Sequence, residues 1–272
     1  MLVAMARGLH REWHERPWII DDPYALPLVG PGWPQLLALY DTIVPRHLFE
    51  LAVGAVCVRS RYAEDRLEAG GFSQYVVLGA GMDSLAWRRP DLLREVTIFE
   101  VDHPGTQAWK RERAALLNLP ENERHVFVPV DFESEALRDA LDRVGFDWGK
   151  PTLFNWLGVV MYLTRDAMTT TLRTLAGAGP GSGVVLTYLS APEFMDDDSL
   201  MLFKLMEPLV AEMGEPFQEA FTPTEFAALV RDCGHTIDES PTPEDLDARY
   251  FAGRKDELRP YTIEWLLSTS LP

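Results

Sequence analysis

The sequence contains very little cysteine. Only Cys57 and Cys233 occur among its 272 residues, and they lie far apart along the chain. Two distant cysteines do not make a disulfide framework or a cysteine-rich metal site, and they fit a reducing compartment. We therefore expect a cytoplasmic protein whose fold does not depend on disulfide bonds.

Positive charge is also scarce. The chain has 25 Lys and Arg residues against 42 Asp and Glu residues, a formal net charge of −17. Such a chain repels nucleic acids and anionic membrane surfaces, so we expect neither as a partner. It has no run of about 18 apolar residues that could cross a bilayer. Charged residues from Arg11 onward make the opening stretch too short for a signal sequence.

Hydrophobic residues make up 47% of the chain, enough for the core of one large α/β domain or two small ones. The first chemical signal is the segment 74–84, where the apolar run Tyr75–Leu78 stops at Gly79 and Gly81. The run predicts a strand buried on both faces. The glycines would let the backbone turn sharply and approach a ligand at the start of a helix. Taken alone, a simple strand-to-helix turn explains this pattern equally well.

A second apolar run, 96–102, ends in two acids at alternate positions, Glu100 and Asp102. Side chains two residues apart on a strand share a face. A doubly wound fold places the acid that binds ribose hydroxyls about 20 residues past the glycine turn, and Glu100 lies at this distance. The alternative is that these acids only terminate the strand. A nicotinamide dinucleotide fingerprint would need a third glycine where this chain has Ser84, so that interpretation is weak.

The remaining pattern alternates strands with helices. Strands are expected near 125–130, 151–157, 183–189, 236–239 and 262–269, with helices near 83–94, 105–117, 134, 164 and 223–233. Alternation of this kind predicts a parallel sheet with ligands at the carboxyl ends of its strands.

Two segments depart from the alternation. Residues 1–70 are typical of helices broken by prolines, ending in a long helix from about Pro45 to Gly70. The stretch 190–222 predicts a helix that starts at three aspartates and carries apolar residues around much of its circumference. We expect that helix to be buried on more than one side.

Several motifs together resemble the leucine carboxyl methyltransferase family. More closely, the chain resembles the bacterial branch of S-adenosylmethionine-dependent O-methyltransferases, which includes enzymes of natural-product pathways. The likeness covers nearly the whole chain. The motifs that carry it are Asp21–Ala25, Arg59–Asp65, Gln74–Arg88, Phe99–Asp102, Lys110 and Trp156–Leu163.

The resemblance implies an α/β fold of the class I methyltransferase (Rossmann-like) type. Its seven-stranded sheet would have an antiparallel last strand and a helical cap over the cofactor. The whole chain, 1–272, would be one methyltransferase domain. Its parts would be the N-terminal cap 1–70, the core sheet 71–189, the cap insertion 190–222 and the core completion 223–272.

The resemblance also implies a set of residues that bind S-adenosyl-L-methionine and its product S-adenosyl-L-homocysteine. These are Arg59, Gly79, Ala80, Gly81, Asp83, Glu100, Asp102, Asp131, Phe132 and Leu157. The glycine turn would approach the amino-acid portion of the cofactor, and Arg59 would pair with its carboxylate.

In the same comparison, Asp102, aided by Glu100, would hold the ribose, and Asp131 and Phe132 would line the adenine. Arg7 is a looser match for a second basic position.

One departure concerns the acceptor. The protein-modifying members of the family carry a glutamate where this chain has Leu157, so a carboxylate contact with the cofactor's ammonium is absent there. We therefore expect a small-molecule acceptor, with a carboxylate or hydroxyl of a secondary metabolite as the leading hypothesis. A protein carboxyl methyltransferase, a nicotinamide-dependent oxidoreductase and a binding module without chemistry remain as alternatives.

The sequence assigns no catalytic residue and no oligomeric state. A carboxylate acceptor is already ionised and needs no general base, whereas a phenol or alcohol gains from one. We expect His235 to be structural and His103 to border the cofactor, while Tyr162 fits either ligand contact or packing. His10 and His14 lack the spacing of a zinc motif, and we expect no metal site.

Overall fold

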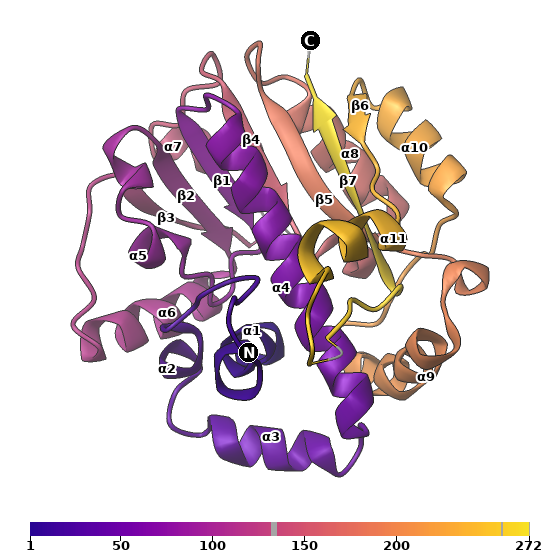
Figure 1. The fold of residues 1–272 in the computed structure, drawn as a ribbon. Helices are drawn as coiled ribbons and strands as arrows, with labels where there is room; N and C mark the ends of the chain where they lie inside the picture. Colours follow the sequence, from indigo (N-terminus) through magenta and orange to yellow (C-terminus); the bar gives the residue numbers. More distant parts are fainter. Residues whose placement is uncertain (132–134, 257, 272) are drawn as a thin grey trace.

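The structure is a computed structural model that describes residues 1–131, 135–256 and 258–271. Within these residues a seven-stranded sheet has the order β3-β2-β1-β4-β5-β7-β6 (Figure 1). The strands are β1 (Gln74–Leu78), β2 (Thr97–Asp102), β3 (His125–Pro129), β4 (Thr152–Trp156), β5 (Gly183–Leu189), β6 (Thr236–Glu239) and β7 (Glu264–Ser270).

The last strand runs against the others, which confirms the predicted sheet. β1 to β5 pair in parallel, whereas β7 is antiparallel to both β5 and β6. Because of this reversal, β7 begins at the edge where the parallel strands end. Glu264, its first residue, lies opposite Leu189, the last residue of β5. Glu264, from the C-terminal part of the chain, thus lies at the edge where ligands bind in such folds.

Helices cover both faces and the carboxyl edge of the sheet. The first half of the described chain contains α1 (Leu2–Trp13), α2 (Ala25–Val29), α3 (Trp33–Asp41), α4 (Arg46–Ala69), α5 (Leu85–Arg88), η1 (Leu92–Arg94) and α6 (Pro104–Leu116). The second half contains α7 (Leu137–Arg143), η2 (Val160–Tyr162), α8 (Arg165–Leu175), η3 (Pro192–Phe194), α9 (Asp197–Glu212), α10 (Pro223–Asp232), α11 (Pro243–Leu246) and η4 (Asp247–Phe251).

Alternate side chains of the central strands pack into two separate cores. In β1, Tyr75 and Val77 face the core formed with α1, α2 and α4, while Val76 and Leu78 face the core formed with α7, α8 and α10. Both faces are therefore covered, which explains the absence of polar alternation in the sequence of this strand.

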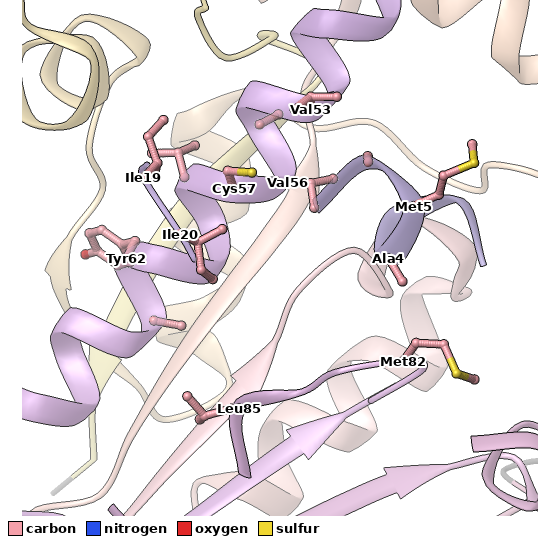
Figure 2. Packing of buried hydrophobic residues seen from close by; sticks show 14 of the residues in the cluster. Ala4, Met5, Ile19, Ile20, Val53, Val56, Cys57, Tyr62, Met82 and Leu85 are labelled. Carbon is pink, nitrogen blue, oxygen red and sulfur yellow. The ribbon is translucent and has the colours of Figure 1, made fainter. Parts of the chain in front are cut away.

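The long helix α4 organises the first of these cores. It follows Pro45 and ends at Gly70, as the sequence predicts. Figure 2 shows Val53, Val56 and Cys57 of this helix among Met5 of α1 and Ile19 of the segment that follows it. The helix α4 therefore lies between the N-terminal helices and the sheet, and its side chains contact both.

The N-terminal helices and α9 gather beyond the carboxyl edge of the sheet, at the lower end of the view in Figure 1. α1 packs on α2 and α4, and α9 also packs on α4. This arrangement leaves one end of the sheet, where β1 to β5 terminate, beneath a layer of helices.

Two helices differ from the sequence predictions. The helix expected over 83–94 is split into α5 and the short turn η1, separated by a stretch that contains Pro90. In α9, Leu202 and Val210 are buried and other apolar residues are half-buried, but Met201 is 48% exposed, so the burial is less complete than expected. The helix packs on α4 while its opposite side faces solvent. Among the described residues, no helix has the length and apolarity that a membrane span requires.

Candidate functional site

The glycine turn lies between the ends of β2 and β4. The backbone amides of Gly79 and Ala80 both donate to the carbonyl of Val101, at 2.9 and 3.1 Å. Gly79 has φ of +70°, and a Cβ built on it would lie 2.4 Å from Cγ2 of Val159. Both the backbone conformation and the close approach require glycine here. The backbone of Gly79 is itself exposed, so a ligand can reach it.

Asp102 is bound directly to this turn. Its Oδ2 accepts a hydrogen bond from the Gly81 amide at 2.5 Å, and its Oδ1 accepts one from the His103 amide at 2.7 Å. A Cβ built on Gly81 would meet no atom within 4 Å, so open space adjoins the carboxylate. Asp102 is half-buried, and a carboxylate has acceptor positions beyond the two that these amides use. Asp83 instead uses Oδ1 to accept from the Leu85 amide at the start of α5.

Glu100 lies in a different environment from Asp102. Its side chain is 1% exposed, forms an ion pair with Lys110 and is hydrogen-bonded to Nε2 of His125 at 2.9 Å. Burial favours the neutral acid, but Lys110 and His125 outweigh it and lower the pKa of Glu100. Both carboxylate oxygens are engaged in this cluster. Of the two acids, Asp102 is the one bound to the turn, and the ribose contact of Glu100 stays a prediction.

The third predicted acid, Asp131, follows β3 at the same edge. The amide of its neighbour Val130 donates to the backbone carbonyl of Asp102 at 2.9 Å, so the two strand ends lie side by side. Asp131 is half-buried. Phe132, the predicted apolar partner of the adenine, lies outside the described residues.

Arg59 reaches the carboxyl edge from α4. Its Nη1 donates to both oxygens of Glu264, at 2.5 and 2.7 Å, and Tyr261 donates its hydroxyl to the same carboxylate. Burial opposes the charge of Arg59, but Glu264 outweighs this effect and raises the pKa of the guanidinium. Arg59 therefore remains a cation in a buried position.

The guanidinium lies against the turn that follows β4. Gly158 has φ of +68°, and a Cβ there would lie 2.5 Å from Nη2 of Arg59, so only glycine leaves room for this contact. The Gly158 amide donates to Oγ1 of Thr187 in β5 at 2.8 Å. Its neighbour Leu157 is half-buried and, like Tyr162, packs at the margin of the first core.

A buried network that was not predicted from the sequence joins the N-terminal segment to the glycine turn. Asp22 pairs with Arg7 at 2.5 Å and accepts the Ser84 hydroxyl at 2.6 Å. Burial alone would raise the pKa of Asp22, but Arg7 and Arg88 outweigh it and lower the pKa. Arg7 also donates to the Met82 carbonyl at 2.7 Å. The serine at the third-glycine position thus binds Asp22, which lies within the motif 21–25.

Several histidines are hydrogen-bonded within the fold, and the placement of His103 beside the cofactor stays a prediction. His235 is buried between Thr269 and the carbonyl of Leu172, which confirms its predicted role. His103 is exposed and caps α6 by accepting the Gly105 amide at 3.1 Å. His10 accepts the Ile19 amide at 3.0 Å. In the part of the chain that the structure describes, no three His, Cys, Asp or Glu side chains cluster as metal ligands.

Known structures share this fold. A DUF574 family protein from Streptomyces avermitilis superposes with a TM-score of 0.61 over 98% of this chain and 97% of its own, at 16% identity. A candidate methyltransferase from Thermobifida fusca gives a TM-score of 0.62 over 90% and 92%, at 19% identity. At these identities the likeness concerns the fold, a seven-stranded class I methyltransferase sheet.

Sequence relatives are closer. YktD of Bacillus subtilis, named as a candidate S-adenosyl-L-methionine-dependent methyltransferase, is 35% identical over 198 residues, 72% of this chain and 65% of YktD. A relative of the same description from Frankia alni is 36% identical over 71% of this chain and 60% of its own. The matches thus span less than two thirds of these relatives.

A family model also matches the chain directly. The model is that of leucine carboxyl methyltransferase, and it matches residues 1–176. The matched segment contains the glycine turn, Arg59, Asp102 and Gly158. The chain belongs to the leucine carboxyl methyltransferase family.

Proposed function

We propose that the protein is an S-adenosylmethionine-dependent O-methyltransferase that acts on a carboxylate or hydroxyl of a small molecule. The observation that carries the proposal is the carboxyl edge of the sheet. There the glycine turn after β1 and the half-buried Asp102 at the end of β2 lie side by side, and the buried Arg59 of α4 lies against the turn after β4, in a chain of this family.

These residues suit the donor chemically. Asp102 has acceptors for ribose hydroxyls next to open space at Gly81, and Arg59 offers a planar cation for a carboxylate. Asp131, at the adjoining strand end, suits the adenine edge. When bound, the donor supplies a methyl group activated by its positively charged sulfur. The protein's contribution is to align the acceptor with this methyl group and to exclude water.

The acceptor would lie between the turn after β4 and α9. Tyr162 stacks on Phe217 with ring centroids 5.6 Å apart, and Phe217 stacks on Phe203 of α9 at 5.4 Å. All three rings are only half-buried. Such aromatic surface favours an apolar acceptor with a polar reacting group.

Tyr162 does not suit the role of general base. Burial and the nearby Glu264 raise its pKa, so its hydroxyl keeps its proton at neutral pH. A carboxylate acceptor needs no base, which makes it the simpler choice for this site. A secondary metabolite in the cytoplasm is the acceptor class that we propose.

Two measurements test this function. Isothermal calorimetry with S-adenosylhomocysteine should give saturable binding, and the absence of any heat at high micromolar ligand would contradict the proposal. Labelled donor incubated with cell extract should place the label in extractable metabolites. Label in macromolecules would instead support protein carboxyl methylation, the second candidate, which the family name favours and Leu157 disfavours.

A further inference from the structure

A buried pair of opposite charges lies at the carboxyl edge of the sheet. The side chains of Arg59 and Glu264 are 7% and 8% exposed. Arg59 comes from α4 in the N-terminal half of the chain, whereas Glu264 opens β7. Burying two charges is costly, and such a pair is often no more stable than apolar residues of similar size. The pair therefore calls for an explanation beyond stability.

The position of the pair relates it to the glycine turn. Nη2 of Arg59 lies against Gly158, and the next residue, Val159, lies against Gly79. Two consecutive residues after β4 thus contact the charged pair on one side and the ligand-accessible turn on the other. The amino-acid end of a ligand seated on the turn would meet this pair.

The hydrogen bonds within the pair leave groups available. Among the described residues, Arg59 uses only Nη1 toward Glu264, so Nη2 and Nε have no such partner. A carboxylate offers about four acceptor positions. Arg59 occupies two of those on Glu264 and Tyr261 occupies a third. One acceptor position remains.

The charges also match the proposed ligand. The methionyl end of the donor is a zwitterion, with an ammonium one carbon away from its carboxylate. A guanidinium alone would suffice for the carboxylate, and an uncommitted Glu264 beside it would repel that group. A cation and an anion placed together complement both ligand charges. The side chain of Leu157, the residue before Gly158, is apolar and cannot accept a hydrogen bond from an ammonium.

We propose that Glu264 accepts a hydrogen bond from the ammonium of the bound donor while Arg59 binds its carboxylate. Tyr261 is then a positioning residue that orients Glu264. The inference rests on the proposed function, because it needs a cofactor with an amino-acid end, and it assigns a ligand contact to a residue outside the segment 1–176 that the family model matches.

The test compares three ligands on the same protein by calorimetry. S-adenosylhomocysteine carries both charges, its deaminated analogue keeps only the carboxylate, and 5′-methylthioadenosine lacks both. In Glu264→Gln we expect affinity for S-adenosylhomocysteine to fall by about 10- to 100-fold, as for the loss of a charged hydrogen bond. Affinity for the two other ligands should change less than about threefold. Glu68→Gln, the same change in an exposed ion pair with Arg89, should alter none of the three.

Three outcomes overturn the proposal, and a fourth would refute the proposed function itself. Equal losses for S-adenosylhomocysteine and the deaminated analogue would mean that Glu264 acts only through Arg59. A wild-type protein that binds both ligands equally would overturn the proposal without any variant, which matters if Glu264→Gln unfolds. Binding of 5′-methylthioadenosine without a preference for charged ligands would refute this inference alone. Binding of none of the three would refute the proposed function.

Discussion

The amide of Gly81 donates to Oδ2 of Asp102 at 2.5 Å, across a separation of 21 residues in the sequence. This bond fixes the glycine turn after β1 to the end of β2. It also holds the carboxylate beside Gly81, where an added Cβ would meet no atom within 4 Å. The same side chain can therefore shape the turn and bind a ligand.

Removing this carboxylate should weaken cofactor binding. For Asp102→Ala we expect the binding free energy of S-adenosylhomocysteine to weaken by about 1–3 kcal/mol, because ribose hydroxyls lose their acceptor. Calorimetry measures the change, and circular dichroism checks the fold. Asp91→Ala, at an exposed carboxylate paired with Arg89, is the matched control and should bind normally. Unchanged affinity in Asp102→Ala would show that the strand-end acid does not contact the ligand.

Removing the charge of Glu100 should lower the stability of the fold rather than the affinity for the cofactor. Glu100→Gln removes one charge of a buried cluster and leaves Lys110, which is fully buried, without its counter-charge. We expect a loss of about 3–5 kcal/mol in the free energy of unfolding, measured with urea. The double variant Glu100→Gln/Lys110→Met should recover part of this loss. A folded Glu100→Gln protein with weakened ligand binding would instead support the ribose contact predicted from the sequence.

Gly79 should not tolerate a side chain. An alanine here would have to adopt a φ of +70°, and its Cβ would lie 2.4 Å from Cγ2 of Val159. We expect Gly79→Ala to lose about 1–3 kcal/mol of stability. Gly253→Ala is the control, since its φ is +77° but no atom lies within 4 Å, so it carries only the backbone cost. The double variant Gly79→Ala/Val159→Ala should remove the steric part. Equal losses in the two single variants would contradict a clash with Val159.

Acid should destabilise the protein partly through His10. Burial lowers the pKa of His10 to about 3, whereas the unfolded chain titrates near 6.5. Between these values the unfolded state binds the extra proton, so stability falls as the pH falls, by about 1.4 kcal/mol per pH unit. Urea unfolding at pH 7 and pH 5 measures this slope. In His10→Gln the decrease should be smaller by about 2 kcal/mol, and an identical slope in both proteins would refute the role of His10.

Much of the fold followed from local patterns. The apolar strands and the helix from Pro45 to Gly70 depend on neighbours in the chain, and the structure confirms them. The glycine turn was also recognisable, because positive φ and close approach restrict a position to glycine. The helix over 83–94 was predicted too long, because Pro90 lies in the stretch that separates α5 from η1.

Sequence reasoning treated Glu100 and Asp102 alike, since they lie two apart on one strand. The structure separates them through residues from other elements. Lys110 of α6 and His125 of β3 enclose Glu100, whereas the glycine turn binds Asp102. Alternation along a strand fixes the face of a side chain, but not the partners that the neighbouring elements supply.

By itself, the sequence determined the elements, the alternating order of strands and helices, and the turn that approaches a ligand, because these depend on contacts between near neighbours. The tertiary structure alone brought Glu264 to Arg59, 205 residues away, and Asp22 to Ser84, 62 residues away. Nothing in the local sequence of β7 marks its first residue as a partner of α4. The reversal of β7 decided this pairing, since it places the start of that strand where the parallel strands end.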